Sequence, residues 1–376
     1  MDPALTIGIE EEYLLVDPET YDLVPDPPEE FMRECKDALG ERVTPEFLKC
    51  QVEIGTPVCS TPAEARHHLI AFRRTLKRIA ERHGLRLMAA STHPFAQWDK
   101  QHHTAAERYD QLDSDMGGVI RRMLICGMHV HIGIEDPEMR IDIMNQATYF
   151  LPHLLALSTS SPFWGGHDMG MKSSRLTIFD GMPRTGVPDQ FDSWSEYETV
   201  VNYLVQAGIL EDSSKIWWDL RPSARFPTLE MRITDVCTRL EDALCIAALY
   251  QCWIRLLVRL KKANQRWRIY PRVLVKENRW LAQRHGITGS LIDLGKRESA
   301  SYEALMEEAL GMLKEDAEAL GCTKEIAHVR TILDRGTSAD RQLRVFKEAT
   351  EAGADNAEAF REVAKDLVEE TAADLP

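Results

Sequence analysis

Alternating apolar and polar positions near the N-terminus predict a β-strand with two different faces. In residues 5–16, the aliphatic Ile7 and Ile9 occupy odd-numbered positions, and Glu10 and Glu12 occupy even-numbered positions. Successive side chains of a strand point to opposite sides, so Glu10 and Glu12 share one face and Glu11 joins the aliphatic side chains on the other. The pattern therefore predicts two carboxylates side by side on one face of a sheet.

Further segments typical of strands follow along the chain, and segments with the period of a helix separate them. Strand-like segments, rich in β-branched and aliphatic residues and flanked by Gly, Pro or Ser, occur near residues 5–16, 47–54, 85–91, 126–134, 174–179, 215–220 and 228–234. Thr61 followed by Pro62 predicts the start of a helix that runs to Gly84. Further helices are expected over 104–123, 138–158, 194–207 and 239–263, and the chain from 271 onward reads as helices without a strand.

This order of elements favours an α+β fold, with a mostly antiparallel sheet covered by helices on one face. We expect one domain over residues 1–376, in which 1–265 carry the sheet and 266–376 form a helical part packed on it. Neither Gly-x-Gly-x-x-Gly nor a P-loop motif is present, which argues against a Rossmann or P-loop nucleotide site. Residues 161–190 form a long Gly-, Pro- and Ser-rich segment whose Arg, Lys and His content favours a functional loop.

Composition narrows the possible partners and the compartment. The chain has 376 residues, 44% of them hydrophobic, and a formal charge of -15, and residues 301–376 hold 18 Asp and Glu against 9 Lys and Arg. Such a surface repels nucleic acid. The eight cysteines form no Cys-x-x-Cys pair and are expected as buried free thiols. With no signal peptide and no window that approaches the length of a membrane span, we expect a cytoplasmic protein; a homo-oligomer stays an open alternative.

Three other segments repeat the pattern of functional side chains on a strand face. Gln51 and Glu53 share a face, and His129 and His131 stand at i and i+2, a spacing common among metal ligands. Singly, each has a simpler explanation: a solvent-facing Glu, or hydrogen-bonded imidazoles. Desolvated carboxylates need a divalent cation or an Arg, and oxygen-rich sites suit Mg²⁺ or Mn²⁺.

The last two predicted strands add guanidinium groups. Glu230 and Arg232 share a face, and so do Trp217, Asp219 and Arg221. A salt-bridged sheet surface explains any one of these pairs, but it explains the whole set poorly. Carboxylates, a divalent cation and Arg together are what phosphoryl transfer requires.

Four ordered motifs resemble one known family. Gly8-Ile-Glu-Glu-Glu12, Gln51-Val-Glu-Ile-Gly-Thr-Pro57, Cys126-Gly-Met-His-Val-His-Ile-Gly133 and Thr228-Leu-Glu-Met-Arg-Ile-Thr-Asp-Val236 resemble the type 2 glutamate-cysteine ligases, also called YbdK-like carboxylate-amine ligases. The similarity covers about residues 5 to 290. It implies the glutamine synthetase/guanido kinase-like catalytic fold, in which a curved antiparallel sheet forms a funnel for ATP, Mg²⁺ and an amino acid.

The resemblance also assigns roles to individual residues. It implies a divalent-metal shell formed by Glu10, Glu12, Glu53, His129 and Glu230. Arg232 resembles the arginine beside the transferred phosphate, and Arg221 is expected at the phosphate or the substrate carboxylate. Arg175 is expected there too, and with Lys172 it is assigned to the nucleotide. His131 is expected to orient a ligand rather than bind the metal itself.

The implied reaction joins a carboxylate to an amine in two steps. By analogy, the γ-carboxylate of L-glutamate attacks the γ-phosphorus of ATP, and the amine of L-cysteine displaces phosphate from the resulting acyl phosphate. Two alternatives stay open. One is a metal-dependent hydrolase around His129 and His131, with His93, His102, His103 or His167 as further ligands; the other is a catalytically silent small-molecule-binding member of the family.

Overall fold

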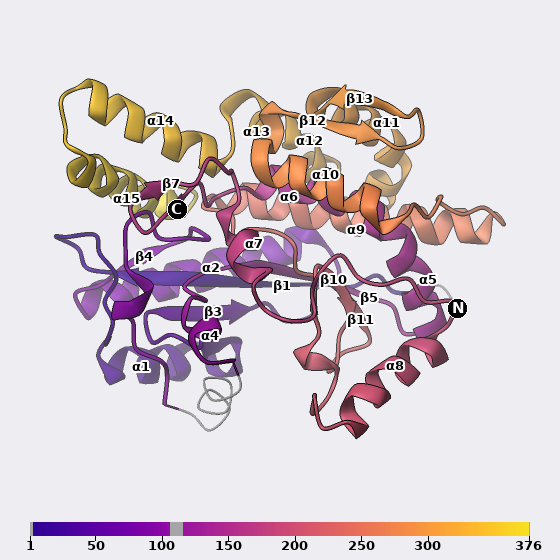
Figure 1. The fold of residues 1–376 in the computed structure, drawn as a ribbon, viewed down its shortest axis with the longest axis horizontal. Helices are drawn as coiled ribbons and strands as arrows, with labels where there is room; N and C mark the ends of the chain where they lie inside the picture. The colour runs from indigo at the N-terminus through magenta and orange to yellow at the C-terminus, as the bar shows by residue number, and fades with distance from the viewer. Residues whose placement is uncertain (1–2, 106–115, 376) are drawn as a thin grey trace.

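The computed structural model describes residues 3–105 and 116–375, and its centre is an antiparallel sheet (Figure 1). The strands follow the order β10-β11-β5-β1-β3-β2, and β4 pairs with the far end of β1. Their bounds are β1 Ile7–Val16, β2 Val43–Pro45, β3 Gln51–Gly55, β4 Arg86–Met88, β5 Met128–Gly133, β10 Leu220–Pro222 and β11 Thr228–Met231. All pairings in this sheet are antiparallel, as predicted.

Smaller pairings lie outside the main sheet. They are β6 (Phe163–Trp164) with β7 (His167–Asp168), β8 (Thr185–Gly186) with β9 (Trp217–Trp218), and β12 (Ser290–Asp293) with β13 (Glu298–Ser301). The β8–β9 pair is parallel and ties the 161–190 segment to the strand that leads into β10.

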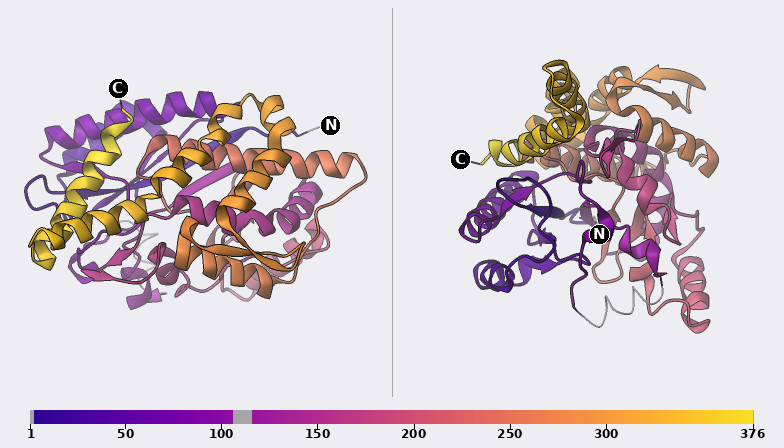
Figure 2. Two further views of the ribbon diagram at one scale, coloured as in Figure 1. Left: turned by 90° about the horizontal axis from the view of Figure 1, so that it is seen from above. Right: turned by 60° about the vertical axis from the view of Figure 1, so that its left-hand side comes forward.

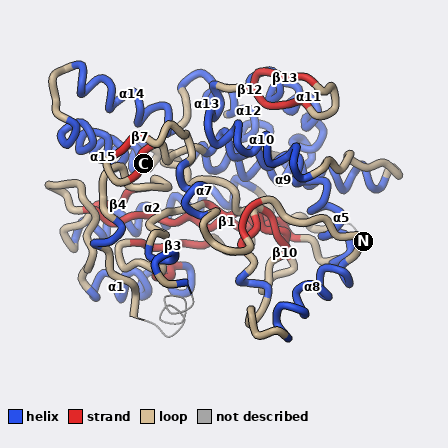
Figure 3. Tube along the Cα trace, viewed as in Figure 1, coloured by secondary structure: helices blue, strands red, loops and turns tan. Residues whose placement is uncertain are grey.

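Helices surround the sheet and dominate the second half of the chain (Figure 3). The α-helices are α1 Glu29–Leu39, α2 Pro62–Arg82, α4 Gly118–Arg121, α5 Pro137–Ala147, α6 Leu151–Ser158, α7 Ser174–Phe179, α8 Trp194–Gln206, α9 Leu240–Lys262, α10 Arg272–His285, α11 Tyr302–Leu320, α12 Thr323–Ala327, α13 Val329–Arg335, α14 Ser338–Glu351 and α15 Asn356–Ala373. α2 begins as predicted, because the side chain of Thr61 accepts a hydrogen bond from the backbone N–H of Glu64 at 3.2 Å.

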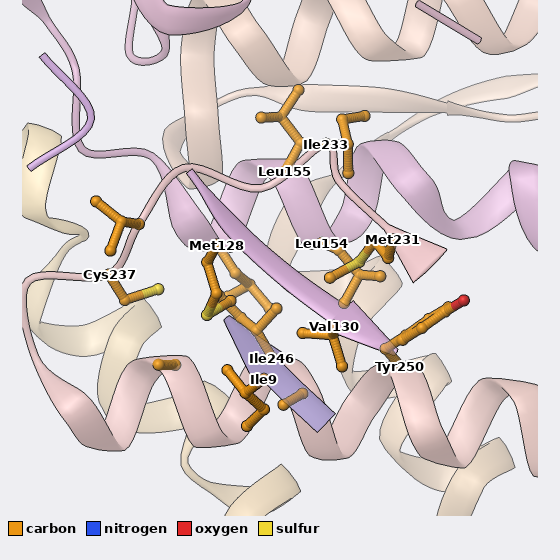
Figure 4. Packing of buried hydrophobic residues seen from close by; sticks show 14 of the residues in the cluster. Ile9, Met128, Val130, Leu154, Leu155, Met231, Ile233, Cys237, Ile246 and Tyr250 are labelled. Atoms are coloured by element: carbon orange, nitrogen blue, oxygen red, sulfur yellow. The ribbon is translucent and has the colours of Figure 1, made fainter. Parts of the chain in front are cut away.

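The apolar face of the sheet packs against α9. Ile9 on β1 and Val130 on β5 are buried beside Ile246 and Tyr250 of that helix (Figure 4). α9 is long and apolar enough, by length and composition, to cross a membrane, so the expectation that no segment approaches such a length is wrong. However, 83% of its most apolar window is buried inside the protein. Packing against the sheet therefore accounts for its composition, as in the core helix of a soluble protein.

Glu11 is the exception on this apolar face, and an arginine of α2 neutralises it. The Nε of Arg73 donates to one carboxylate oxygen of Glu11 at 2.9 Å and an Nη donates to the other at 2.6 Å. Arg73 also donates to the backbone oxygens of Thr238 and Cys237. Both side chains are fully buried, so the predicted division of the three consecutive glutamates between the two faces is confirmed.

The C-terminal helices close back onto the N-terminal half. Figure 2 shows α15, in yellow, beside the indigo and purple N-terminal elements. The hydroxyl of Thr371 accepts a hydrogen bond from the backbone N–H of Ala89 at 2.9 Å, next to β4. Buried side chains from Leu5 to Leu367 belong to one hydrophobic cluster, so the helical part shares its core with the sheet.

Several predicted elements differ from the structure. Residues 174–179 form α7 rather than a strand, because Leu176 and Phe179 are buried at a helical spacing. The hairpin β12–β13 contradicts the expectation of no strand after residue 271. The helix expected over 138–158 is two helices, α5 and α6, separated by a 3₁₀ turn. Of the helix expected over 104–123, residues 106–115 lie outside the described part, and the rest contains only the short α4.

Candidate active site

Strand register brings the predicted polar residues onto one face. Residues that pair across an antiparallel ladder share a face. Glu12 pairs with Glu53, Glu10 with His129, and Glu230 with both His131 and Arg221. These side chains line a cavity of about 500 Å³ on the face opposite α9, called here the carboxylate cavity.

Two overlapping groups in the carboxylate cavity have the donors of a metal site. Glu10, His129 and Glu230 form one group, and Glu12, Glu53 and His129 form the other; within each, the potential ligand atoms lie within 4.8 Å of one another. His129 Nδ1 is 3.0 Å from a Glu10 oxygen and its Nε2 is 4.0 Å from a Glu12 oxygen. The structure thus brings together all five residues that the sequence assigns to a metal shell, and this hard-oxygen and imidazole set fits Mg²⁺ or Mn²⁺.

Burial and neighbouring groups shift the pKa values of the carboxylates in the cavity. Burial alone would raise the pKa of Glu10, but hydrogen bonds to His129 and His131 outweigh burial and hold that pKa well below its usual value. Burial and the neighbouring carboxylates, Glu46 first, hold the pKa of Glu53 well above its usual value. A divalent cation bound beside Glu53 would favour the charged form of this carboxyl, so its surroundings suit a cation ligand.

The three predicted arginines reach the cavity but differ in their contacts. Arg221 uses four of its five N–H groups on the protein: Nε and Nη2 donate to Glu230 at 2.9 and 3.2 Å, and Nη1 donates to the backbone oxygens of Ser214 and Ile216. Arg232 donates to Glu230, and its Nε has no partner among the described residues. Together Arg232 and Arg221 overcome the effect of burial and hold the pKa of Glu230 well below its usual value.

Arg175 has no carboxylate partner among the residues described. Its Nη atoms donate to the backbone oxygens of Arg232 and Ile233 at 3.3 to 3.4 Å, and its buried Nε has no partner in this part of the chain. Arg175 therefore brings a positive charge to the cavity wall that is not spent on an ion pair, as an anion-binding group requires.

Gly127 lies next to both Glu12 and Arg175 in the wall of the cavity. Its backbone N–H donates to a Glu12 carboxylate oxygen at 2.6 Å. A Cβ at this position would lie 2.4 Å from Nη2 of Arg175, far inside van der Waals contact. The absence of a side chain at residue 127 therefore lets Arg175 and Glu12 both take their places beside it.

Loops and the short helices α4 and α7 supply most of the other residues of the carboxylate cavity, which has an apolar part and a charged rim. One wall is apolar and consists of Phe47, Ile120, Met123, Ile125, Phe179 and Met182. The rim near β10 and β11 carries Lys215, Arg225 and Phe226. These residues were not predicted, because loop conformation decides which of them meet; only Phe179 and Met182 fall within the 161–190 segment whose composition favoured function.

Some predicted residues lie elsewhere. Lys172 is not among the cavity-lining residues; its ammonium donates to Asp340 at 2.6 Å and so ties the loop to α14, which gives no support to nucleotide binding. Asp219 follows β9 and pairs with Arg279 at 2.7 Å, also outside the cavity, because the chain leaves regular strand geometry between β9 and β10. His131 contacts Thr228 Oγ1 through Nδ1 at 2.9 Å, and its Nε2 lies 3.4 Å from a Glu10 oxygen. Its role in orienting a ligand stays a prediction.

The hydrolase alternative gains no further histidine ligand from the residues that the structure describes. None of His93, His102, His103 and His167 lines the carboxylate cavity as described. His93 is buried, with Nε2 at 2.8 Å from the backbone oxygen of Tyr21. Among the described residues that line the cavity, the histidines are therefore the two of β5.

Comparison with known families agrees with this arrangement. The model of glutamate-cysteine ligase family 2 matches residues 6–368. The chain belongs to this family. It is 56% identical over its full length to a protein of Rhodospirillum rubrum named "Putative glutamate--cysteine ligase 2", of which the match covers 97%, and 52% identical to a protein of the same name from Jannaschia sp., of which the match covers 98%. As a family member it is an ATP-dependent ligase.

Solved structures share the fold at low sequence identity. A bifunctional glutathione synthetase from Pasteurella multocida matches with a TM-score of 0.70 and 15% identity over 98% of this chain and 53% of its own. A glutamate–cysteine ligase from Francisella tularensis, solved in complex with AMP, matches with a TM-score of 0.68 and 12% identity over 100% of this chain and 90% of its own. These likenesses confirm the predicted fold class, an antiparallel sheet covered by helices.

Proposed function

We propose that the carboxylate cavity joins the γ-carboxylate of L-glutamate to the amine of L-cysteine, with ATP as phosphoryl donor and Mg²⁺ or Mn²⁺ bound by Glu10, Glu12, Glu53, His129 and Glu230. The observation that carries the proposal is the pair of ligand groups that share His129, set beside two arginines whose Nε groups have no hydrogen-bond partner in the part of the chain that the structure describes. The family model and the relatives' names support the choice of substrates.

The chemistry divides into two transfers. An oxygen of the glutamate γ-carboxylate attacks the γ-phosphorus of ATP, the bond to the bridging oxygen breaks, and ADP leaves. The cysteine nitrogen then attacks the acyl carbon of this acyl phosphate, loses a proton, and expels inorganic phosphate. When bound, the divalent cation neutralises phosphate oxygens and lets triphosphate approach a carboxylate-lined wall.

The chain's own residues position the reactants. Arg175 and Arg232 present guanidinium N–H groups to the transferred phosphoryl group, on which negative charge is spread during transfer. Arg221 acts indirectly, because its contacts hold Glu230 and the backbone at Ser214 and Ile216. The apolar wall with Phe47 and Ile125 excludes water, which protects an acyl phosphate from hydrolysis.

The deciding experiment is a screen of carboxylate and amine pairs for ATP-dependent phosphate release, with the amide product identified by mass spectrometry. We expect release with L-glutamate plus L-cysteine and little release when either is omitted. Phosphate release with a different acid, and none with glutamate, would replace the substrate assignment while leaving the ligase chemistry in place. Metal-dependent cleavage of an amide without ATP would instead support the hydrolase.

The proposal extends to the cell compartment. Eight free cysteines, all buried, fit a reducing cytoplasm. The substrates of the proposed reaction are small molecules, and an acidic surface with a formal charge of -15 gives no support to a nucleic-acid partner.

A further inference from the structure

A second group of metal-ligating side chains lies on the other side of β1. The thiol of Cys59, the carboxylate of Glu64 and the imidazole of His68 have potential ligand atoms within 4.8 Å of one another. We call these three residues the Cys59 cluster. Thiolate, imidazole and carboxylate together are the ligand types of zinc sites, whereas the two ligand groups found in the described part of the carboxylate cavity consist of carboxylates and an imidazole.

The backbone brings the three side chains of the Cys59 cluster to the same place. Cys59 pairs with Ile7 in an antiparallel bridge whose two hydrogen bonds are both 2.8 Å, and Ile7 points to the apolar face of the sheet. Glu64 and His68 stand at i and i+4 near the start of α2, so both side chains lie on the same side of that helix. The Cys59 cluster therefore lies on the helix-covered side of β1, opposite the face that carries Glu10 and Glu12.

Each member has ligand capacity left. A carboxylate oxygen of Glu64 accepts from the backbone N–H of Ser60 at 2.7 Å, which holds the group beside Cys59 and leaves its other oxygen available. His68 makes ring contacts with His67 and Phe72, but neither of its ring nitrogens has a hydrogen-bond partner among the described residues. The Cys59 thiol donates to the backbone oxygen of Pro57 at 3.2 Å.

The distances suit a small tetrahedral ion after modest side-chain movement. Two donors bound to zinc at about 2.3 and 2.1 Å lie roughly 3.6 Å apart, so ligand atoms now within 4.8 Å need to approach by about 1 Å. Glu64 is exposed and His68 is half-buried, so their side chains can rotate, while Cys59 is held by the buried backbone bridge.

We propose that Cys59, Glu64 and His68 bind a thiophilic divalent cation of the zinc type, with solvent in the fourth position. The bound ion would tie the connection after β3 to the first turns of α2, the helix that supplies Arg73 to Glu11 beneath the active-site strand. The site would therefore stabilise the scaffold under β1 rather than take part in the ligase reaction. This inference does not depend on the substrates of the proposed function.

Cobalt substitution tests the site directly, because a thiolate bound to Co²⁺ gives a near-ultraviolet charge-transfer band that oxygen and nitrogen ligands do not give. Metal-free full-length protein, kept reduced and in excess Mg²⁺ to occupy the carboxylate cavity, is titrated with Co²⁺. We expect the band to saturate at one equivalent and to disappear when Zn²⁺ is added. Cys59→Ser should abolish it, and His68→Gln should weaken Co²⁺ binding at least about tenfold.

His67→Gln is the matched control, since His67 neighbours His68 but does not belong to the Cys59 cluster. It should bind Co²⁺ like the wild type. Absence of the band in wild-type protein, or its persistence in Cys59→Ser, would overturn the proposal. If Cys59→Ser does not fold by circular dichroism, His68→Gln and Glu64→Gln decide the question, and wild-type affinity in both would equally refute the site.

Discussion

Gly127 offers the sharpest test of how the backbone positions the catalytic wall. In Gly127→Ala the new Cβ would stand 2.4 Å from Nη2 and 2.9 Å from Cζ of Arg175, where carbon contacts normally begin at about 3.4 Å. The guanidinium must therefore move by about 1 Å. The hydrogen bonds of Arg175 to the backbone oxygens of Arg232 and Ile233 are already 3.3 to 3.4 Å long, so such a shift breaks them.

The expected loss concerns activity more than stability. The clashing atoms are the end of a flexible side chain, so overpacking should cost about 1 to 3 kcal/mol of unfolding free energy. A misplacement of about 1 Å in a group that positions the substrate costs roughly 100-fold in rate. We therefore expect kcat/KM for ADP formation to fall about 100-fold, while circular dichroism shows a folded protein.

Two further variants make this reasoning refutable. Gly311→Ala, in α11 with no atom within 4 Å of the new Cβ, controls for the change of residue type and should keep wild-type activity. If Gly127→Ala acts by moving Arg175, then adding it to Arg175→Ala should cost little more than Arg175→Ala alone. Full additivity in this double-mutant cycle would show that Gly127→Ala does not act through Arg175. Wild-type kcat/KM in Gly127→Ala would show that the position of Arg175 does not matter for catalysis.

Three other changes have outcomes that follow from the structure. Glu53→Gln should abolish ATP turnover without loss of melting temperature in metal-free protein, because Glu53 shares its surroundings with other carboxylates; normal turnover at saturating Mg²⁺ would remove it from the metal site. Arg73→Met should destabilise the protein by about 3 to 5 kcal/mol in urea unfolding, since it leaves Glu11 buried and unpaired, and Glu11→Gln in the same background should recover part of that loss. Burial lowers the pKa of His153 to about 4 from 6.5, so the unfolded chain takes up a proton that the native state does not. Native stability should therefore be full above pH 6.5 and decrease by up to roughly 3 kcal/mol as the pH falls to 4; His153→Phe should lack this part of the decrease, and identical pH profiles would contradict the assignment.

The sequence predicted the structure correctly where the alternation of side chains along a strand decides which face each residue occupies. A strand has only two faces, so the assignment of Glu10 and Glu12 to one side and Glu11 to the other required no knowledge of neighbouring strands. Glu53 and His129 pair directly with residues of the first strand, so their side chains lie on the same face as Glu10 and Glu12. The composition of the polar face was therefore predictable from local patterns.

Prediction failed where tertiary packing chooses between local alternatives. Ser174–Phe179 is short and apolar enough for either a strand or a helix, and the burial of Leu176 together with Phe179 selects the helix. The hairpin of β12 and β13 spans only four residues on each strand, too few for alternation to stand out against helical segments on both sides. The assignment of Lys172 to the nucleotide stays a prediction; its contact with Asp340, 168 positions further along the chain, is one that no local pattern reveals.

The three consecutive glutamates show how the same residue type can serve structure on one face of a strand and function on the other. Beneath β1, Glu11 is neutralised from within the chain by Arg73. Above it, Arg232 and Arg221 neutralise Glu230. Glu12 and Glu53 have no arginine or lysine partner among the described residues; Glu12 accepts from the backbone of Gly127, and Glu53 accepts from the hydroxyl of Thr44 at 2.9 Å. Since two half-buried carboxylates so close together are costly without a positive charge, this end of the cavity has the strongest physical requirement for a neutralising cation.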